Sequence, residues 1–410
     1  MRGLLRQTVA DRFETKHLPW FQALVDAPSH TYARDDVEAA AKLIDASMAE
    51  LGFRCDRHAD PSGRFADHRV YSPPGLAPDA PAFALVGHVD TVFPRDLGFL
   101  NFERDSDGDT VRGPGTLDMK SGLSTIVFAL GALAEVAPDQ LVGLPLRFLL
   151  NSDEEVGSPS SRDLLERFAA TCSGAMVFEG GRAEDKIITS RKGGGMFTFE
   201  VTGNAAHAGN NHEEGINAIH ALALMIPRIE ALTDYERGVT VNVGLIEGGT
   251  AKNTVPETAK CVVDTRFIRK VDADAVVAAL HAIADDPFAG LDLHPARLRQ
   301  VRVKLDGRVT RPPMEASEGA QKIRLAYEPF AAAAGLETGE APLQGGGSDA
   351  NILAACGVPC VDGLGPFGRH FHKVQEWSSL SSLRRRTEAL ACFLHEGLRP
   401  LHESLTGTLG

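Results

Sequence analysis

The chain has 410 residues, of which 43% are hydrophobic and 24% are charged. This composition is typical of a folded protein with two or three domains and excludes an intrinsically disordered chain. Its 42 basic and 55 acidic side chains leave a net charge of -13. That balance argues against nucleic acid or an anionic membrane surface as the partner, because phosphates need a positive surface.

The sequence predicts no membrane segment and no disulfide framework. The longest uncharged helical stretch, 121–134, is shorter than the roughly 18–20 residues that cross a bilayer. Charged residues such as Arg6, Asp11 and Glu14 interrupt the N-terminal segment, so it lacks the hydrophobic region of a signal peptide. Six cysteines are scattered along the chain, which is not the pattern of a disulfide-rich fold. We therefore expect a cytoplasmic protein.

The first 190 residues alternate between helix-like and strand-like segments. Apolar residues at helical spacing predict a helix over 35–51, which ends at Gly52. Further predicted helices span 121–136 and run from Ser158 to about Ala170. Short apolar runs predict strands over 82–86, 146–150 and 174–178. Apolar strands separated by helices indicate a parallel sheet that is covered on both faces.

After about residue 192 the pattern changes to alternating apolar and polar residues. Strands and helices are predicted in the order strand, helix, strand, strand, helix, strand, over 196–202, 215–232, 239–246, 258–268, 273–283 and 300–305. This order predicts a small α+β sandwich. From about 316 the α/β pattern returns, with helices over 317–334, 350–356 and 380–398 and a strand over 359–361. We predict an α/β domain in two parts, 1–192 and 309–410, with a lid-like domain inserted at 193–308.

Five short segments hold the side chains best suited to metal chemistry. They are GHVDTV with His88 and Asp90, GPGTLDMKSG with Asp118, NSDEEVGS with Glu154 and Glu155, FEGG with Glu179, and GRHFHKVQEW with His370 and His372. Each lies at the carboxyl end of a predicted strand or in the loop that follows. Because the carboxyl ends of parallel strands meet at one edge of a sheet, we expect these side chains to converge there.

Two histidines and three carboxylates are the right set for two metal ions about 3.5–4 Å apart that share one bridging carboxylate. Mixed imidazole and carboxylate ligands suit Zn²⁺, with Mn²⁺ or Co²⁺ as alternatives. Taken singly, the segments have plainer interpretations: Asp118 can cap the following helix, and an exposed Glu pair is usually solvated. The joint pattern favours a metal centre, because so many acids are costly to gather without cations.

These motifs resemble the aminoacylase and glutamate carboxypeptidase family of cocatalytic zinc hydrolases. The matching segments are GHVDTV, GPGTLDMKSG, DEEVGS, FEGG, AAHAG, GGGSDA and HKVQEW, and they span residues 85–377. The resemblance implies a split α/β catalytic domain with an inserted α+β, ferredoxin-like dimerisation or lid domain. It also implies a homodimer that acts on a small peptide or an N-acyl amino acid.

The resemblance assigns a role to each residue of the metal centre. Asp118 would bridge two metal ions, and the other ligands would each bind one ion: His88, Glu155, Glu179 and His372. Asp90 would orient the His88 imidazole. Glu154 would be the general base toward a water that bridges the metals.

The last ligand can be either of two histidines. The family pattern is a histidine followed four residues later by glutamate and an aromatic residue. His372 fits this spacing, with Glu376 and Trp377. His370 would fit a shorter loop, so we favour His372 and expect His370 to line the pocket.

The resemblance also indicates residues for substrate recognition. His207, in AAHAG, would stabilise the oxyanion in the active site of a partner subunit, although an ordinary surface histidine is the plainer interpretation. Asn253 and Arg266 resemble a carboxylate-binding strip, in which Arg266 would clamp a substrate carboxylate; an ion pair on an outer strand is the alternative. Gly346 lies in a glycine run that would pass close to the substrate.

We therefore predict a metal-dependent hydrolase that cleaves an amide bond next to a free carboxylate. The segments SDEEVGS, FEGG and GGGSDA look closest to the glutamate carboxypeptidase branch, which favours a C-terminal acidic residue. The first alternative is an N-acyl amino-acid deacylase of the acetylornithine or succinyl-diaminopimelate type. The second is a catalytically inactive binding scaffold, against which Glu154 and the full ligand set argue.

Overall fold

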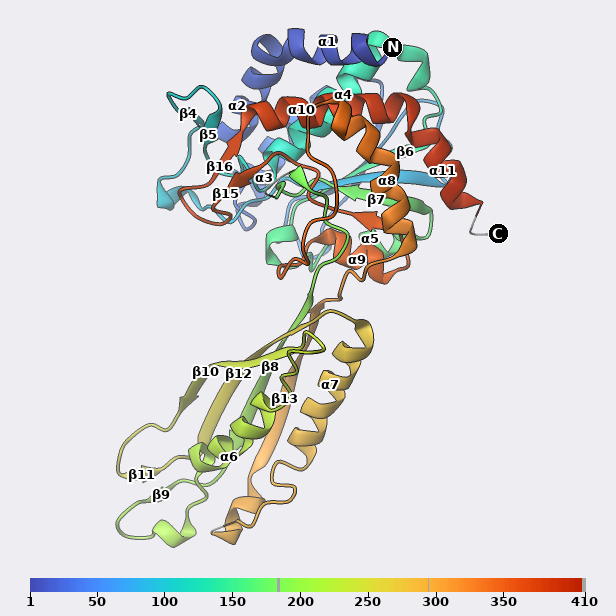
Figure 1. The fold of residues 1–410 in the computed structure, drawn as a ribbon. Helices are drawn as coiled ribbons and strands as arrows, with labels where there is room; N and C mark the ends of the chain where they lie inside the picture. The colour runs from blue at the N-terminus through green and yellow to red at the C-terminus, as the bar shows by residue number, and fades with distance from the viewer. Residues whose placement is uncertain (183–184, 294, 408–410) are drawn as a thin grey trace. The chain divides into compact units, whose positions relative to one another are not determined.

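The computed structural model describes residues 1–182, 185–293 and 295–407. Within it the chain forms two compact units (Figure 1). The first unit comprises Met1–Ser190, Ala316–Gln344 and Ser348–Gly410, and the second comprises Arg191–Glu315 and Gly345–Gly347. The sequence-based boundary after 308 falls inside a strand, β13 (Arg302–Arg311), which pairs with β8 (Gly193–Thr202) along its length. The inserted unit is therefore longer at this end than the sequence pattern indicated.

A six-stranded sheet, in the order β1-β2-β6-β3-β7-β14, forms the centre of the first unit. Its central strands β3 (Ala82–His88), β6 (Leu146–Asn151) and β7 (Cys172–Val177) are fully buried and run parallel, as does β14 (Cys360–Val361). Buried on both faces, these strands need the continuous apolar runs from which they were predicted.

The parallel pairing predicted for the three apolar strands is confirmed, but one edge of the sheet is antiparallel and was not predicted. There β1 (Arg54–His58) pairs antiparallel with β2 (His68–Ser72), which pairs antiparallel with β6. The residues of β1 are polar and mostly exposed, so a search for apolar runs does not find this strand. An edge strand needs only one partner and tolerates such a composition.

Helices surround the central sheet. In Figure 1, α4 (Lys120–Val136) and α10 (Leu380–Glu396) lie above the strands, and α5 (Arg162–Ala169) and α9 (Asp349–Ala355) lie below them. The other helices of this unit are α1 (Arg2–Arg12), the π-helical turn η1 (Phe13–His17), α2 (Leu18–Asp26), α3 (Arg34–Glu50), α8 (Glu318–Ala333) and α11 (Leu398–Thr406). The sequence pattern predicted α3, α4, α8, α9 and α10, but not α1, α2 or α11.

Helix α5 begins later than predicted. The expected start was Ser158, but that residue has a φ of 55 and precedes the helix. The Asp153 carboxylate accepts hydrogen bonds from the main-chain N–H of Ser160 at 2.6 Å and of Ser161 at 3.1 Å. These bonds hold a turn in front of α5, which therefore begins at Arg162.

A second, small sheet joins segments that are far apart in the sequence. Its order is β15-β16-β5-β4, from β4 (Glu103–Arg104), β5 (Thr110–Arg112), β15 (Gly368–Arg369) and β16 (Trp377–Ser379). The pairing of β16 with β5 brings the loop after β5 next to the loop between β15 and β16. The sequence pattern did not predict this sheet, because its strands have only two or three residues.

The second unit is a ferredoxin-like α+β sandwich. Its chain order is β8, α6 (Ala218–Glu230), β10 (Thr240–Gly248), β12 (Thr258–Phe267), α7 (Lys270–Asp285) and β13, and its antiparallel sheet has the order β10-β12-β8-β13. Phe197, Phe199 and Val201 of β8 point to a core that α6 and α7 complete. The predicted fold class, a split α/β domain with an inserted α+β domain, is confirmed.

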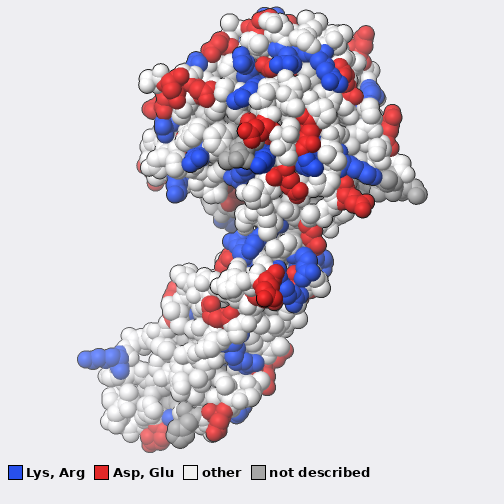
Figure 2. Space-filling view, viewed as in Figure 1, with Lys and Arg blue, Asp and Glu red and all other residues white. Residues whose placement is uncertain are grey.

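None of the helices within the described residues is both long and apolar enough to cross a bilayer. Acidic and basic side chains are interspersed over the face of the molecule in Figure 2. The six cysteines are free thiols, as the sequence indicated.

Candidate metal centre

Three neighbouring strands of the central sheet deliver most of the candidate ligands. His88 is the last residue of β3, and β3 lies between β6 and β7. Glu154 and Glu155 begin the 3-10 turn η4 (Glu154–Val156) that follows β6, and Glu179 follows β7. The three strands are parallel and end at the same edge, so their side chains meet there, as predicted.

Asp118 and His372 reach the same place by another route. Asp118 lies in the loop between β5 and α4, and His372 lies between β15 and β16. The expectation that each candidate follows a strand of the main sheet is therefore wrong for these two. The small sheet brings their loops together instead.

The Asp118 carboxylate stands between two imidazoles. Its Oδ1 lies 3.4 Å from Nε2 of His88, and its Oδ2 lies 3.1 Å from Nε2 of His372. Each imidazole has a second carboxylate beside it. Glu179 Oε1 is 3.6 Å from His88 Nε2, and Glu155 Oε2 is 3.2 Å from His372 Nε2. The cluster is thus a row of two half-sites with Asp118 common to both.

These separations suit ligands of shared ions. With zinc–ligand distances of 2.0–2.2 Å, two donors on one tetrahedral ion lie roughly 3.3–3.6 Å apart. The four distances above run from 3.1 to 3.6 Å. A carboxylate that offers one oxygen to each half-site has the arrangement of a bridging ligand in a two-metal site.

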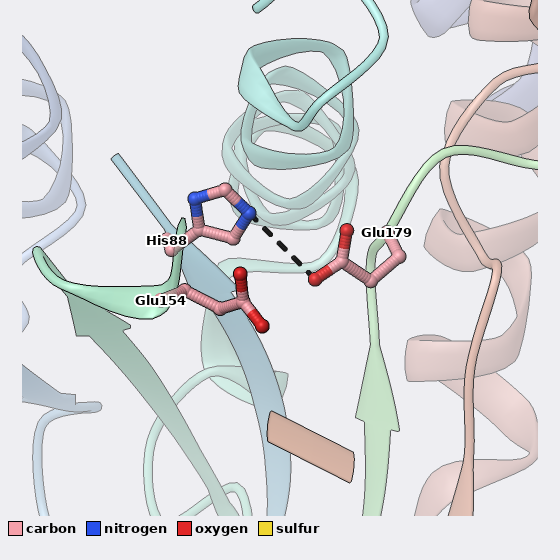
Figure 3. Close-up of side chains that lie close together, drawn as sticks. All are labelled: His88, Glu154 and Glu179. Atoms are coloured by element: carbon pink, nitrogen blue, oxygen red, sulfur yellow. Dashed lines mark ion pairs between the residues drawn. The ribbon is translucent and has the colours of Figure 1, made fainter. Parts of the chain in front are cut away.

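Glu154 lies inside the same cluster. One potential ligand atom from each of His88, Glu154 and Glu179 lies within 4.8 Å of the other two, and the same holds for His88, Asp118 and Glu155. Figure 3 shows the Glu154 carboxylate beside His88 and Glu179, with the His88–Glu179 ion pair dashed. Adjacent residues of η4 thus place two carboxylates at different points of the cluster.

The donor set fits divalent cations. His88 Nε2 and Glu155 Oε1 are buried and, within the described residues, have no hydrogen-bond partner. Such groups are costly to bury unless something binds them. Asp118, Glu154, Glu155 and Glu179 carry up to four negative charges in a buried site. Two divalent cations would balance this charge.

The pKa shifts of the candidate ligands also agree with a site for divalent cations. Burial, together with the nearby Asp118 carboxylate, raises the pKa of both Glu155 and Glu179 to about 8. Hydrogen bonds to Asp118 and Glu155 raise the pKa of His372 to about 11. Burial alone would lower the pKa of His88, but Glu179 and Asp118 outweigh it and raise that pKa well above its usual value. Without cations the cluster therefore retains protons at neutral pH.

Asp90 is buried beneath the cluster and contacts it on two sides. Nδ1 of His88 lies 3.3 Å from Oδ1 of Asp90 and 3.0 Å from its main-chain oxygen, which turns Nε2 toward the carboxylates. The Asp90 carboxylate also accepts the main-chain N–H of Glu154 and of Glu155, each at 3.2 Å. One side chain thus orients the imidazole and fixes the turn that carries both glutamates.

His372, rather than His370, lies within bonding distance of the cluster. Both residues have positive φ values, 60 and 69 respectively. His370 is exposed, and none of the ion pairs found in the described residues involves it. The His372 side chain is 57% exposed, whereas the other members of the cluster are mostly buried.

Sequence reasoning assigned no role to three residues that support the cluster or the loops beside it. Glu376 is fully buried and accepts the main-chain N–H of Leu117 at 2.7 Å and of Asp118 at 3.2 Å. Thr31 donates its hydroxyl to Asp90 at 2.8 Å. The only signal for Glu376 was its place four residues after His372, and we found no signal for Thr31.

Lys120 is the third residue, and it holds the start of α4. Its buried ammonium donates to the main-chain oxygens of Val25, at 3.3 Å, and Ala27, at 2.8 Å. Burial lowers the pKa of Lys120 to about 7, against the opposing influence of Glu376. The sequence placed this lysine in LDMKSG without a role.

The second unit holds His207 and Asn253 side by side. His207 is on β9 (Ala206–His207), which pairs with β11 (Thr254–Val255), and the main-chain oxygen of Asn253 accepts from Ala208 at 2.9 Å. Nδ1 of His207 accepts the N–H of Gly209 at 3.1 Å and of Asn210 at 3.2 Å. The proton of the neutral ring is therefore on Nε2.

Arg266 and Gly346 also lie in the second unit. Nε and Nη2 of Arg266 each lie 2.9 Å from a carboxylate oxygen of Asp264, which is the ion pair considered as the alternative above. The main-chain oxygen of Gly346 accepts from Arg191 at 3.0 Å. A side chain at Gly346 would meet nothing within 4 Å, so space remains beside it.

A split α/β unit with paired imidazoles, a shared aspartate and flanking glutamates defines a metal-dependent hydrolase, and comparison with known proteins agrees. A family model described as "Peptidase dimerisation domain" matches residues 189–291. Carboxypeptidase G2 of Pseudomonas sp. (strain RS-16) is 28% identical over 368 residues, which cover 89% of this chain and 85% of that protein. Acetylornithine deacetylase of Myxococcus xanthus is 30% identical over 300 residues, which cover 68% of this chain and 77% of that protein.

The fold is also that of solved structures. The M20 family metallo-carboxypeptidase Sso-CP2 from Sulfolobus solfataricus superposes with a TM-score of 0.70 and 16% identity, covering 94% of this chain and 99% of the other. The chain belongs to the M20 peptidase family and is a hydrolase of that family. The family prediction made from the motifs is confirmed.

Proposed function

We propose that this protein is a dinuclear metal-dependent amidohydrolase that cleaves an amide bond next to a free carboxylate, as a carboxypeptidase-type exopeptidase. The observation that carries the proposal is the arrangement around Asp118. Its two oxygens face two imidazoles, and each imidazole has its own glutamate. The Glu154 carboxylate stands next to this row.

One metal position would be held by His88, Asp118 and Glu179, and the other by His372, Asp118 and Glu155. Nitrogen and carboxylate donors without thiolates suit Zn²⁺, and Co²⁺ or Mn²⁺ suit the same set. When bound, the ions supply Lewis-acid polarisation of the substrate carbonyl and lower the pKa of water. Asp90 keeps His88 Nε2 aimed at the site.

Glu154 is the proposed general base. It takes a proton from the attacking water and delivers that proton to the leaving nitrogen. Its main-chain N–H donates to Asp90 at 3.2 Å. This hydrogen bond fixes the backbone that carries the Glu154 side chain. Its neighbour Glu155 points to the half-site of His372, which leaves Glu154 for proton transfer.

His207 is proposed to act in the active site of a partner subunit. Its ring carries the proton on Nε2 because Nδ1 accepts two main-chain N–H groups, and an exposed N–H donor suits a developing oxyanion. A homodimer is supported by the match to a dimerisation domain. It is also supported by the edge strand β10, on which Leu245 is 64% and Ile246 is 55% exposed.

The free carboxylate of the substrate is proposed to bind at Arg266, with Asn253 and the loop at Gly346 beside the substrate. Asp264 engages Nε and Nη2 of Arg266 at 2.9 Å each. This is the two-point geometry that a substrate carboxylate would adopt on a guanidinium. A substrate would therefore exchange with Asp264 at this position.

A second candidate, an N-acyl amino-acid deacylase, would use the same metal ligands. Its support is the 30% identity to acetylornithine deacetylase, against 28% over a longer segment for carboxypeptidase G2. Both activities cleave an amide next to a free carboxylate, so they differ only in the group that is accepted.

The test is a substrate panel on protein reconstituted with Zn²⁺ or Co²⁺. N-blocked dipeptides, including some with C-terminal glutamate, are compared with N-acetyl and N-succinyl amino acids. Each substrate is paired with its C-terminal carboxamide.

We expect cleavage of free acids, with C-terminal glutamate preferred, and at least tenfold lower kcat/KM for the carboxamides, since one charge-assisted contact is lost. Equal cleavage of acid and carboxamide would reject carboxylate recognition. Selective cleavage of the acylated amino acids would replace the exopeptidase with the deacylase.

A further inference from the structure

His372 is the most exposed of the proposed ligands in the cluster. Its side chain is 57% exposed, whereas that of Asp118 is 8% exposed and that of Glu155 is 4% exposed. It lies in the loop between β15 and β16, and its φ is 60. An exposed loop residue loses more conformational freedom on binding than a residue at the end of a buried strand. Some other group must therefore set its distance from Asp118.

Glu376 connects the two loops concerned. Its carboxylate oxygen Oε1 accepts from the N–H of Leu117 at 2.7 Å and of Asp118 at 3.2 Å. Its own N–H donates to the main-chain oxygen of Lys373 at 2.8 Å, which closes the turn directly after His372. One residue is thus bonded to the segment that carries Asp118 and to the segment that carries His372.

Glu376 is not itself placed as a ligand. It belongs to neither of the potential metal-binding groups found in the described residues. Its oxygen Oε1 accepts from the main-chain N–H groups of Leu117 and Asp118 and, at 3.5 Å, from the hydroxyl of Thr116. A fully buried carboxylate is costly, so its presence here calls for a function that an apolar residue would not provide.

We propose that Glu376 is a positioning residue that sets the distance between Asp118 and His372, and thereby the affinity of the metal position that these two share with Glu155. The inference rests on the proposed metal-dependent function. This role requires an acceptor oxygen at a fixed distance from the main chain of Glu376. That oxygen binds the loop of Asp118, while the main-chain N–H of Glu376 binds the loop of His372. The other position shares Asp118, but its remaining ligands are His88 at the end of β3 and Glu179 directly after β7, and Glu376 bonds to neither of their segments, so we expect that position to be affected less.

The experiment measures metal binding rather than turnover. Wild-type protein is stripped of metal and titrated with Zn²⁺ by calorimetry, and bound zinc is counted by mass spectrometry after dialysis. Wild type is expected to bind two ions. Glu376→Ala is expected to lose affinity at one position by about 10- to 100-fold, the usual cost of removing a group that orients a ligand, and to retain one ion after dialysis.

Two variants separate the position of the acceptor oxygen from the presence of a carboxyl group and from folding. Glu376→Gln keeps an acceptor oxygen at the same reach and is expected to bind two ions with affinity near that of wild type. Glu376→Asp keeps the carboxyl group but is one methylene shorter, so it is expected to weaken one position as the alanine variant does. It also provides the test if the alanine variant does not fold.

A matched control is Glu38→Ala. Glu38 is a partly buried carboxylate that, like Glu376, accepts a main-chain N–H, from Asp67 at 2.7 Å; it pairs with Arg69 and contacts no member of the cluster. It is expected to bind two ions normally. Glu376→Ala or Glu376→Asp with two ions at wild-type affinity would overturn the positioning role, and so would a Gln variant as weak as the Ala variant. A wild-type protein that binds no divalent ion would instead reject the proposed function.

Discussion

The two units of this chain present their candidate residues in opposite ways. In the first unit, His88, Asp118 and Glu179 are buried and fixed through the ends of strands or through buried carboxylates. In the second unit, His207 on β9 and Asn253 just before β11 are exposed, and Arg266 pairs with its neighbour Asp264. The first arrangement is organised before any ligand binds, whereas the second offers donors to an outside group.

This difference follows from the chemistry that each unit is proposed to perform. Metal ligands must converge within a few tenths of an ångström, and buried neighbours hold them there. Residues that meet a substrate or a partner subunit must remain accessible. Four predictions test this contrast, beginning with the largest expected effect.

Glu154→Gln tests the contrast at the centre of the first unit. The substitution keeps the size of the side chain but removes the proton acceptor, so kcat is expected to fall by about 10²- to 10⁴-fold while both metal ions stay bound. Glu155→Gln is the matched variant one residue away, and it is expected to lose one metal ion. Metal analysis with steady-state kinetics checks both, and near-normal kcat in Glu154→Gln would exclude it as the base.

His207→Ala tests the exposed donor of the second unit. Loss of one oxyanion donor typically costs about 10²- to 10³-fold in kcat, and metal content and dimerisation should not change. His212→Ala, a nearby exposed histidine, is the control and should retain full activity. Wild-type kcat in His207→Ala would remove it from the reaction.

The pH dependence of metal binding tests how far the buried cluster is organised by charge. Glu155 and Glu179, each with a pKa raised to about 8, must lose protons to become ligands, and protons compete with the metal below that pH. Affinity for Zn²⁺ should therefore fall as pH decreases from 8 to 6, by roughly tenfold per pH unit for each proton displaced. Calorimetry in buffers of different ionisation enthalpy should detect proton release at pH 7. Binding without proton release would contradict these raised values.

Leu245→Asp tests whether the exposed edge of the second unit is an interface. A charge at a 64% exposed position should leave folding and metal content intact but weaken self-association by about tenfold or more, as for a central interface residue. Tyr235→Asp, at an 84% exposed position of the same unit, is the control. Sedimentation measurements decide, and an unchanged dimer in Leu245→Asp would place the interface elsewhere.

The sequence was most informative where local pattern and chemistry coincide. The buried parallel strands are recognisable in the sequence as apolar runs. Directly after those runs come four of the candidate residues: His88, Glu154, Glu155 and Glu179. Spacing within a motif also favoured His372, the histidine that lies beside Asp118. Helices α3, α4, α8 and α10 were predictable because their apolar residues recur at helical spacing.

Short or polar elements were not predictable in this way. The edge strand β1 and the strands of the small sheet lack apolar runs, so nothing in the local sequence indicates their pairing. The contacts of Glu376 with Asp118 and of Thr31 with Asp90 join residues that are 258 and 59 positions apart. No periodicity links residues at such separations.

By itself the sequence determined which residue types were available for metal chemistry and which strand ends would present them, because periodicity and side-chain chemistry are local properties. Tertiary structure alone decided that Asp118 stands between two imidazoles and that Asp90 supports both an imidazole and a turn. The physical reason is that distances between side chains depend on how separate segments pack, and packing is a property of the whole chain.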